Sequence, residues 1–304
     1  MKTIIGRVVS TLLLLLASSL AVFAAIRFSG GDVTAARMPA SASAEDREEF
    51  RKSIGLDQPI LKQYVTYMGD FVTGDLGNSL TNNARISSLA VEKIRNSLIL
   101  GGSSLLIVFL VGVPLGMIAS LRRNTWVDTG ITSFSVAGMA IPNFWLALIA
   151  IHLFASTLHW LPSGGQGGWK SVILPALVLS AEGIALTVRI TRSAMLENIG
   201  QDFVRTLRAS GFSERRIYFK HVLRSSLLPI ISLAGLRVGQ VVGYALVVET
   251  IFGWPGVGQI LVNAVLRRDY PVIQFFSLLL VVVVTLGNLF ASIGYTLANP
   301  RLRK

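Results

Sequence analysis

The side chains that could do chemistry in this chain are few and scattered. It has 304 residues with three histidines and no cysteine, which excludes a cysteine nucleophile, a disulfide and a thiolate zinc site. His152 and His159 are seven residues apart and could share a helix face, where ordinary interfacial histidines are favoured over a nickel-related site. His221 lies among arginines, and no Ser/His/Asp arrangement surrounds it. The sequence therefore predicts neither a catalytic residue nor a metal site.

Nucleotide chemistry has no motif here either. The phosphate-binding pattern G-x-x-x-x-G-K-[ST] is absent, and no Gly-Lys pair exists from which to build it. A chain without this loop cannot cradle ATP phosphates in the usual way. We therefore expect the chain to bind no cofactor and to have no enzyme activity of its own.

Two ionisable side chains, Glu182 and Arg237, lie well inside long apolar stretches, and Glu249 lies near the external end of one of them. Glu182 is about nine residues before Thr191, and Arg237 is about eight residues after Pro229. Because the two helices run in opposite directions, both side chains lie roughly 12 to 14 Å from the cytoplasmic side of the membrane. We hypothesise either a Glu182–Arg237 pair or a joint lining of a substrate route, because intramembrane charges usually face a partner or a wet cavity. Glu249 could line an external gate or extend its carboxylate to the headgroups.

The composition fixes the kind of protein that must position these residues. The chain is 52% apolar and 14% charged, with a mean hydropathy of +0.62, whereas soluble domains are about 25% charged. A helix needs roughly 20 apolar residues to cross a bilayer. Six stretches meet this length and predict an all-α polytopic membrane protein: Val8–Ile26, Ser97–Ser120, Phe134–Leu158, Val172–Ile190, Leu228–Phe252 and Val272–Ala298. The first apolar run exceeds a usual signal-peptide core, so a spanning helix is favoured over cleavage.

The basic residues give the orientation. The formal net charge is +12, and with both termini inside, the cytoplasmic segments hold many lysines and arginines but few acidic residues. The charge therefore indicates topology and contact with the lipid bilayer, and it does not favour nucleic-acid binding. The predicted topology crosses the membrane several times, with both termini cytoplasmic.

The spans divide the chain into three parts. Residues 1–28 form the first transmembrane helix, 29–96 an external segment, and 97–304 a five-helix core that includes a cytoplasmic loop at 191–227. Glycines at every fourth position of the fifth span suit close helix packing. They are Gly235, Gly239 and Gly243.

The external segment contains two helix signals. The run from Ser43 to Asp46 resembles a capping box, and Gly55 is expected to stop the helix that it starts. Asp57 is expected to cap a second helix, with Pro59 in its first turn. That helix is amphipathic, which favours packing on the bundle or lying at the interface over docking a soluble partner. Its apolar face is Ile60, Leu61, Tyr64, Val65, Met68 and Phe71.

The cytoplasmic loop predicts a helix, a tight turn and a second helix. Helix formers continue to Ala209, Gly211 can adopt the positive φ of a helix end, and Ser213 can cap the helix that follows. A short helix presented in this way suits a groove on another protein. A basic loop that only fixes topology and touches anionic lipid is an equal alternative on spacing alone.

This loop carries a family resemblance. QDFVRTLRASGFSERRIYFKHVLRSSLLP resembles the EAA loop of ABC importer permeases, with Arg205-Thr206-Leu207 in place of Glu-Ala-Ala and Gly211 as the signature glycine. The run from His221 to Arg224 replaces Ile-x-Leu-Pro, as in the oligopeptide/dipeptide/nickel branch. Other segments resemble the same branch over nearly the whole chain: GLDQPILKQY, GDLGNSL, PNFWLALIAIHLFASTLHWLPSGG and VVETIFGWPGVGQILVNAVLRRDYPVIQ.

The resemblance implies a type I ABC importer permease in the bacterial inner membrane, which forms half of the pathway for peptides or a similar small solute. Its implied partners are a second homologous permease, two ATPase subunits that use ATP and Mg, and an extracytoplasmic solute-binding protein. The implied ATPase-coupling residues are Phe203, Val204, Arg205, Thr206, Leu207, Arg208, Ala209, Ser210, Gly211, Phe212 and Ser213, with Phe203 and Leu207 filling the partner's groove. A secondary transporter or channel subunit is the alternative. The solute stays open among dipeptide, oligopeptide, nickel chelate, opine and metallophore, as does whether the second permease is another copy.

Overall fold

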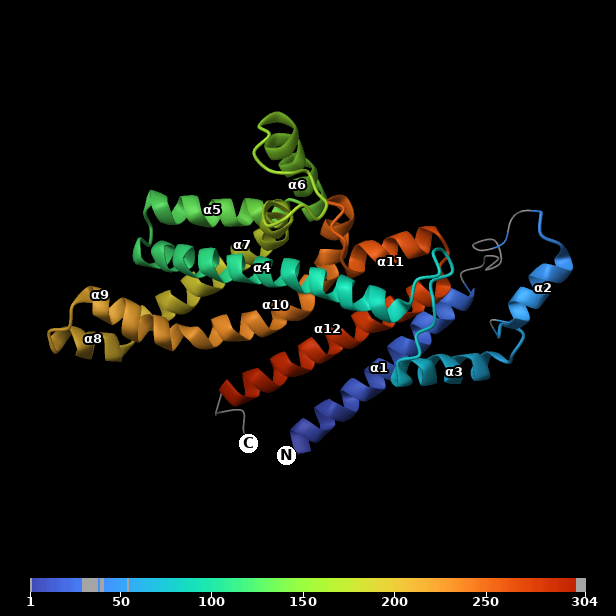
Figure 1. Ribbon diagram of the computed structural model, residues 1–304. Coiled ribbons are helices and arrows are strands. Elements are labelled where there is room, and N and C mark those ends of the chain that lie inside the picture. The colour runs from blue at the N-terminus through green and yellow to red at the C-terminus, as the bar shows by residue number, and fades with distance from the viewer. Residues whose placement is uncertain (1, 29–37, 39–40, 54, 299–304) are drawn as a thin grey trace. The chain divides into compact units, whose positions relative to one another are not determined.

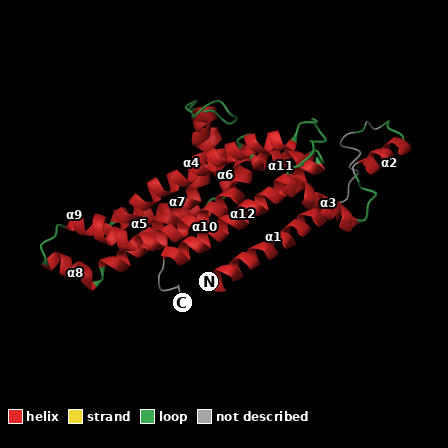
Figure 2. Cartoon of the chain, turned by 60° about the horizontal axis from the view of Figure 1, so that its bottom comes forward, coloured by secondary structure: helices red, strands yellow, loops and turns green. Residues whose placement is uncertain are grey.

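The computed structural model describes residues 2–28, 38, 41–53 and 55–298. In that part of the chain the structure is helical, and no strand occurs apart from one isolated bridge between Asn78 and Arg85 (Figure 2). Two compact units are present, each with its own core. Unit 1 comprises Met1–Ser97 and Pro255–Thr285, and unit 2 comprises Leu98–Trp254 and Leu286–Lys304. The predicted all-α class is confirmed.

Among the residues that the structure describes, five helices are long and apolar enough to cross a membrane, in agreement with five of the six predicted spans. The helices extend beyond the predicted apolar stretches because polar residues at their ends continue the same backbone hydrogen bonding. They are α1 (Lys2–Phe28), α4 (Ile86–Leu121), α7 (Lys170–Ile199), α10 (Leu223–Ile251) and α12 (Tyr270–Ala298).

The remaining predicted span is not one straight helix. α5 (Trp126–Ala140) and α6 (Asn143–Ala150), which continues as the π-helix η2 (Ile151–Thr157), meet at an angle of 102°. Pro142 causes the break, because proline disfavours helical geometry in the residue before it, and Ile141 is extended with φ −85° and ψ 120°. The bent pair counts as a sixth span if both helices belong to one crossing.

The end of η2 separates the two histidines. His152 lies within η2, whereas His159 lies beyond its end and has a φ of +53°. The His159 Nδ1 atom is 2.8 Å from the carbonyl oxygen of Ala155. The expectation that the two histidines share one helix face is therefore wrong.

The segment between α1 and α4, predicted to be external, forms α2 (Ala44–Ser53) and α3 (Ile60–Thr73) in unit 1. The capping box is confirmed: Ser43 Oγ accepts the N–H of Asp46, and the Asp46 carboxylate accepts the N–H of Ser43. The Ser43 hydroxyl also donates to the Asp46 carboxylate at 2.6 Å, and this bond, together with the one from the Ser43 N–H, holds the pKa of Asp46 below its ordinary value. Gly55 has the expected positive φ of +69°. The expected cap at Asp57 is wrong, because Pro59 occupies the N-cap position without a side-chain bond.

The amphipathic face of α3 is only partly covered. Tyr64 and Tyr67 stack near Phe23 of α1, and Phe71 lies against Phe275 of α12. Burial raises the pKa of the Tyr67 hydroxyl, which donates to the carbonyl oxygen of Gln274. Met68 is half-buried, whereas the other apolar side chains of α3 are exposed, so α3 packs on the rest of unit 1 through only part of its apolar face. The exposed ones are Ile60, Leu61, Val65 and Val72.

One buried carboxylate holds the turn before α4. Asp269 is 3% exposed and accepts hydrogen bonds from the Ser79 hydroxyl and from the backbone N–H groups of Leu80, at 3.0 Å, and Thr81, at 3.3 Å. Asp269 precedes α12, so this one side chain joins segments about 190 residues apart in sequence.

Asp269→Ala is expected to open this turn. The substitution leaves the buried Ser79 hydroxyl and the Leu80 N–H without an acceptor, at a cost of about 1–3 kcal/mol for each group. Amide hydrogen exchange at residues 79–84 should accelerate, while Asp75→Ala, at an exposed position, should leave the exchange unchanged. Equal exchange in both variants would show that Asp269 does not hold the turn.

Unit 2 is organised around α7. Figure 1 shows α5, α6 and α10 around this helix, and all three contact it. The core lies between them and includes Leu100, Leu174, Val178, Val248 and Phe252. After α7 the chain forms the short α8 (Asp202–Ala209) and α9 (Glu214–Arg216), and the π-helix η3 (Ile217–Val222) then leads directly into α10. α11 (Val257–Leu266) belongs to unit 1.

Glycines bring α4 and α7 into close contact. A Cβ atom on Gly112 would lie 2.7 Å from Thr187 Cβ, and one on Gly116 would lie 2.7 Å from both Thr191 Cβ and the Val188 carbonyl oxygen. This is a small-xxx-small contact, in which the absence of side chains lets two backbones approach. The expectation of close packing at Gly243 is wrong, because a Cβ there meets nothing within 4 Å.

Candidate functional site

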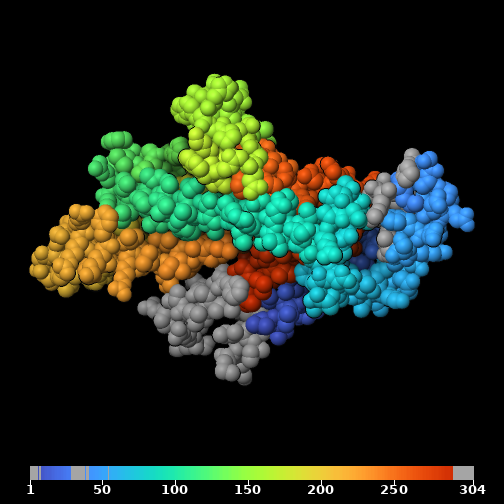
Figure 3. Space-filling view, viewed as in Figure 1, coloured from blue at the N-terminus to red at the C-terminus, as the bar shows by residue number. Residues whose placement is uncertain are grey.

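The turn after α7 is the part of unit 2 that the sequence singles out. α7 ends at Ile199, and α8 begins two residues after Gly200. Gly211 has a φ of +80°, a value that glycine adopts without strain, and it reverses the chain between α8 and α9. In Figure 3 this segment forms a protruding end of unit 2 on the face in view. We call residues Phe203–Ser213 the coupling segment.

A small apolar cluster fixes the coupling segment to the helices beside it. Val204 is fully buried against Met117 of α4, Met195 of α7 and the buried residues Ile217 and Val222 of η3. Leu207 and Phe212 are partly buried against the same cluster. α8 is therefore held against the ends of α4 and α7 and against η3, which leads into α10.

Polar and aromatic contacts close the turn. Arg208 Nε lies 2.7 Å from a Glu214 carboxylate oxygen, and Arg208 Nη2 donates to the Tyr218 hydroxyl at 3.1 Å. The bond to Glu214 is the main cause that raises the pKa of Arg208, so this side chain stays charged. Arg216 lies over the ring of Phe212 at 4.8 Å. Ser213 occupies the N-cap position of α9 but makes no side-chain cap bond, contrary to expectation.

The coupling segment presents one polar face with a single aromatic edge. Leu207 is half-buried against the same cluster, because it lies three residues after Val204 on the same helical face. Whether it also fills a partner's groove stays a prediction. Phe203 is 36% exposed and forms the edge of the open face. The other exposed residues of this face are Arg205, Thr206, Ala209 and Ser210.

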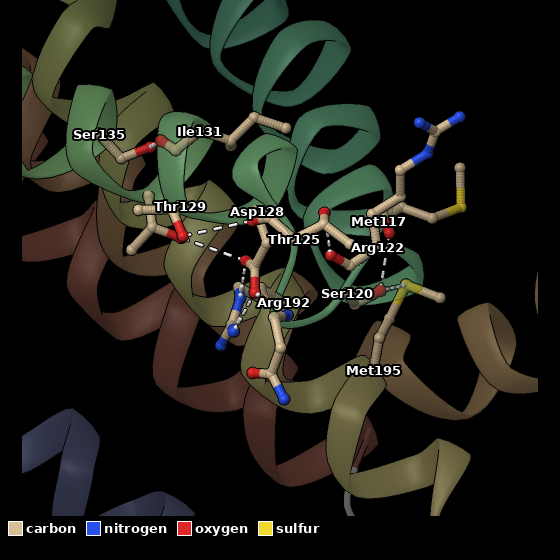
Figure 4. Close-up of polar contacts among 12 residues, drawn as sticks. Met117, Ser120, Arg122, Thr125, Asp128, Thr129, Ile131, Ser135, Arg192 and Met195 are labelled. Carbon is tan, nitrogen blue, oxygen red and sulfur yellow. Dashed lines mark hydrogen bonds and ion pairs between the residues drawn. The ribbon is translucent and has the colours of Figure 1, made fainter.

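A buried ion pair near the coupling segment was not predicted. Arg192 of α7 donates from Nε and Nη2 to both carboxylate oxygens of Asp128 of α5, at 2.6 and 2.7 Å. Figure 4 shows the two side chains pointing toward each other between these helices. Asp128 is 4% exposed and also accepts the N–H of Asn124 at 3.0 Å. No local sequence pattern predicts this pair, because its members are 64 residues apart.

The intramembrane charges of α7 and α10 lie together. Arg237 Nη2 is 3.4 Å from a Glu182 carboxylate oxygen and 3.5 Å from the Glu182 carbonyl oxygen. The Arg237 side chain is 3% exposed and that of Glu182 is 29% exposed. Glu249 is fully buried in protein, so its carboxylate does not extend to the headgroups as one alternative required. Whether these three residues line a substrate route stays a prediction.

Family models match both parts of the chain. Residues 112–304, more than half of the chain, match the binding-protein-dependent transport system inner membrane component. Residues 1–91 match the N-terminal model of the same membrane components.

The curated relatives are transport permeases matched along almost their full length. The chain is 37% identical to the oligopeptide transport system permease protein AppB of Bacillus subtilis, over 98% of each chain. It is 37% identical to the di/tripeptide transport system permease protein DppB of Pseudomonas aeruginosa, over 94% of each. It is 34% identical to the glutathione transport system permease protein GsiC of Escherichia coli, over 99% of this chain and 98% of the relative.

Solved structures agree on the fold. A chain of the MetNI methionine ABC transporter in an inward-facing conformation superposes with a TM-score of 0.60 at 20% identity, over 69% of this chain and 96% of that chain. A second crystal form gives a TM-score of 0.57 over 70% of this chain. With five or six apolar helices and these relatives, the chain belongs to the binding-protein-dependent inner membrane components, as a multi-pass ABC importer permease of the oligopeptide/dipeptide family.

Proposed function

We propose that this permease forms half of a pathway for peptides and that its coupling segment receives movement from a separate ATPase. The observation that carries the proposal is α8, a short helix anchored by Val204 on α4, α7 and η3, with its other face open. Such a helix can transmit a rigid-body displacement between two conformations of the spans. ATP and Mg would be used by the partner, in keeping with the absence of a phosphate-binding motif here.

Peptides are the proposed solutes because the relatives named above are an oligopeptide, a di/tripeptide and a glutathione permease. A nickel chelate has less support. In the described part of the chain, no group of three His, Cys, Asp or Glu side chains could hold a metal ion. Family membership favours the importer over the secondary transporter and the channel that the sequence left open.

The proposed assembly follows the family arrangement. This chain pairs with a second permease, two ATPases and an external solute-binding protein. Both termini and the coupling segment lie in the cytoplasm, where the basic residues are concentrated. Glu182 and Arg237 form a structural pair beside the route, and their contact joins the two helices that flank the coupling segment.

Thr206→Trp is expected to uncouple transport without unfolding the permease. Thr206 lies on the exposed face of α8, so a large ring there obstructs a partner's groove and leaves the Val204 cluster intact. Co-purification of the ATPase and ATP-driven uptake of a labelled dipeptide should each fall about ten-fold or more, the equivalent of roughly 1.4 kcal/mol.

Arg122→Trp is the matched control, at an exposed position in another turn. It should retain both the bound ATPase and uptake. Loss of both readouts in the control, or wild-type behaviour of Thr206→Trp, would contradict the role of the coupling segment. Uptake that persists when the ATPase is inactivated would contradict the importer mechanism itself.

A further inference from the structure

A groove between α5 and α7 lies apart from the coupling segment. It encloses about 180 Å³, and every residue that lines it belongs to unit 2. α5 contributes Thr132, Val136 and Met139, and α7 contributes Val188, Arg189 and Arg192. The two helices contact each other along this groove.

The groove has a cationic end and an apolar end. Arg189 is exposed, and no hydrogen bond or ion pair connects it with another residue that the structure describes. Arg192 lies about 4.5 Å further along α7 and is fixed by Asp128, whose negative charge it balances. One positive charge therefore stays unbalanced at this end. Val136 and Met139 are 59% and 39% exposed at the other end.

The position of the groove along α5 matches the surface of a bilayer. Trp126 begins α5 and is 85% exposed, as is typical of tryptophans at the headgroup level. Asp128 follows two residues later, which places the Asp128–Arg192 pair at nearly the same level. From there the groove continues along α5 toward Met139, into the apolar part of the span.

We propose that this groove binds an anionic phospholipid. The phosphate contacts Arg189, the glycerol lies beside Thr132, and one acyl chain follows Val136 and Met139. Charge complementarity selects the lipid class, because the groove offers an unbalanced arginine and no spare carboxylate for a choline group. A free phosphate would gain the charge interaction but would leave the apolar wall uncovered. This inference depends on the membrane location and does not require the peptide substrate or the ATPase contact.

The test is native mass spectrometry of the assembled transporter, titrated with dioleoylphosphatidylglycerol or dioleoylphosphatidylcholine. The wild-type protein should retain more phosphatidylglycerol than phosphatidylcholine. Arg189→Gln should weaken that binding about five-fold, the usual contribution of one basic residue at a membrane surface. Arg123→Gln, at an exposed basic residue outside the groove, should leave it unchanged. Val136→Trp, which fills the apolar end from the exposed rim, should also reduce it.

Three results would overturn the proposal. The first is equal retention of the two lipids by wild-type protein. The second is equal loss in Arg189→Gln and Arg123→Gln, which would indicate general surface charge. The third is complete displacement of phosphatidylglycerol by inorganic phosphate at millimolar concentration, which would indicate a free-anion site. Thermal unfolding of each variant, measured beside the titration, confirms that the folded protein is being compared.

Discussion

Gly116→Val is expected to destabilise the membrane core by about 3 kcal/mol, the upper end of the range for overpacking. The Cβ atom alone would lie 2.7 Å from the Val188 carbonyl oxygen, which is backbone of α7 and cannot rotate away. α4 and α7 would have to separate, and the Met117–Met195 contact beside the coupling segment would be lost with them. The measurement is thermal unfolding of the purified transporter, together with uptake.

Gly102→Val on the same helix is the matched control. A Cβ atom at Gly102 meets nothing within 4 Å, so valine can be added there without displacing a neighbour. Its melting temperature should stay near that of the wild type. If Gly116→Val melted at the same temperature as Gly102→Val, the close contact of α4 and α7 would be contradicted.

Glu182→Gln is expected to cost about 3 kcal/mol of stability, and more than Arg237→Met. Removing the carboxylate leaves a permanently charged guanidinium that is 3% exposed, and an uncompensated buried charge typically costs 3–5 kcal/mol. Arg237 Nε already has no partner among the described residues. Arg237→Met instead leaves the Glu182 carboxylate without its partner. That side chain is 29% exposed, so its unpaired charge is less buried than that of Arg237 and the substitution costs less stability.

The double variant Glu182→Gln with Arg237→Met completes the cycle. Because it removes both charges, it should recover most of the stability that Glu182→Gln loses. The free energies of unfolding of the four proteins give the coupling energy directly. Additive effects of the two substitutions would show that the side chains act independently and that the 3.4 Å contact contributes nothing.

Local sequence patterns predicted where the helices lie, but they predicted neither the bend at Pro142 nor most of the contacts between helices. The spans and the Ser43–Asp46 capping box follow from apolar length and cap spacing, both of which are local signals. The 102° bend lies at Pro142 within a continuous apolar stretch, so hydropathy alone did not reveal it. A search for X-Pro steps inside predicted spans would have marked Pro142, but it would equally have marked Pro114, Pro175 and Pro229, each of which lies inside a continuous helix.

Contacts between distant segments were the harder part. Glycine spacing on α10 suggested close packing, and Gly239 does lie close to Gly287 of α12, where an added Cβ atom would be 3.7 Å from the Gly239 backbone. The spacing did not indicate the tighter contacts at Gly112 and Gly116 of α4, which Thr187 and Thr191 of α7 face. The Asp128–Arg192 pair likewise needs the antiparallel approach of two helices, which single-sequence periodicity does not specify. By contrast, the Glu182–Arg237 contact could be predicted. The rise per residue places both side chains at similar depth in the membrane, on two helices that run in opposite directions.

The most direct test of coupling uses the absence of cysteine from the chain, so that one introduced thiol is unique. Thr206→Cys, on the exposed face of α8, is treated with a short bifunctional reagent in native membranes, with Val72→Cys on α3 as the control. The account predicts a cross-link from Thr206→Cys to the ATPase and none from Val72→Cys. It would be contradicted if a membrane-impermeant reagent added outside modified Thr206→Cys and no ATPase were captured.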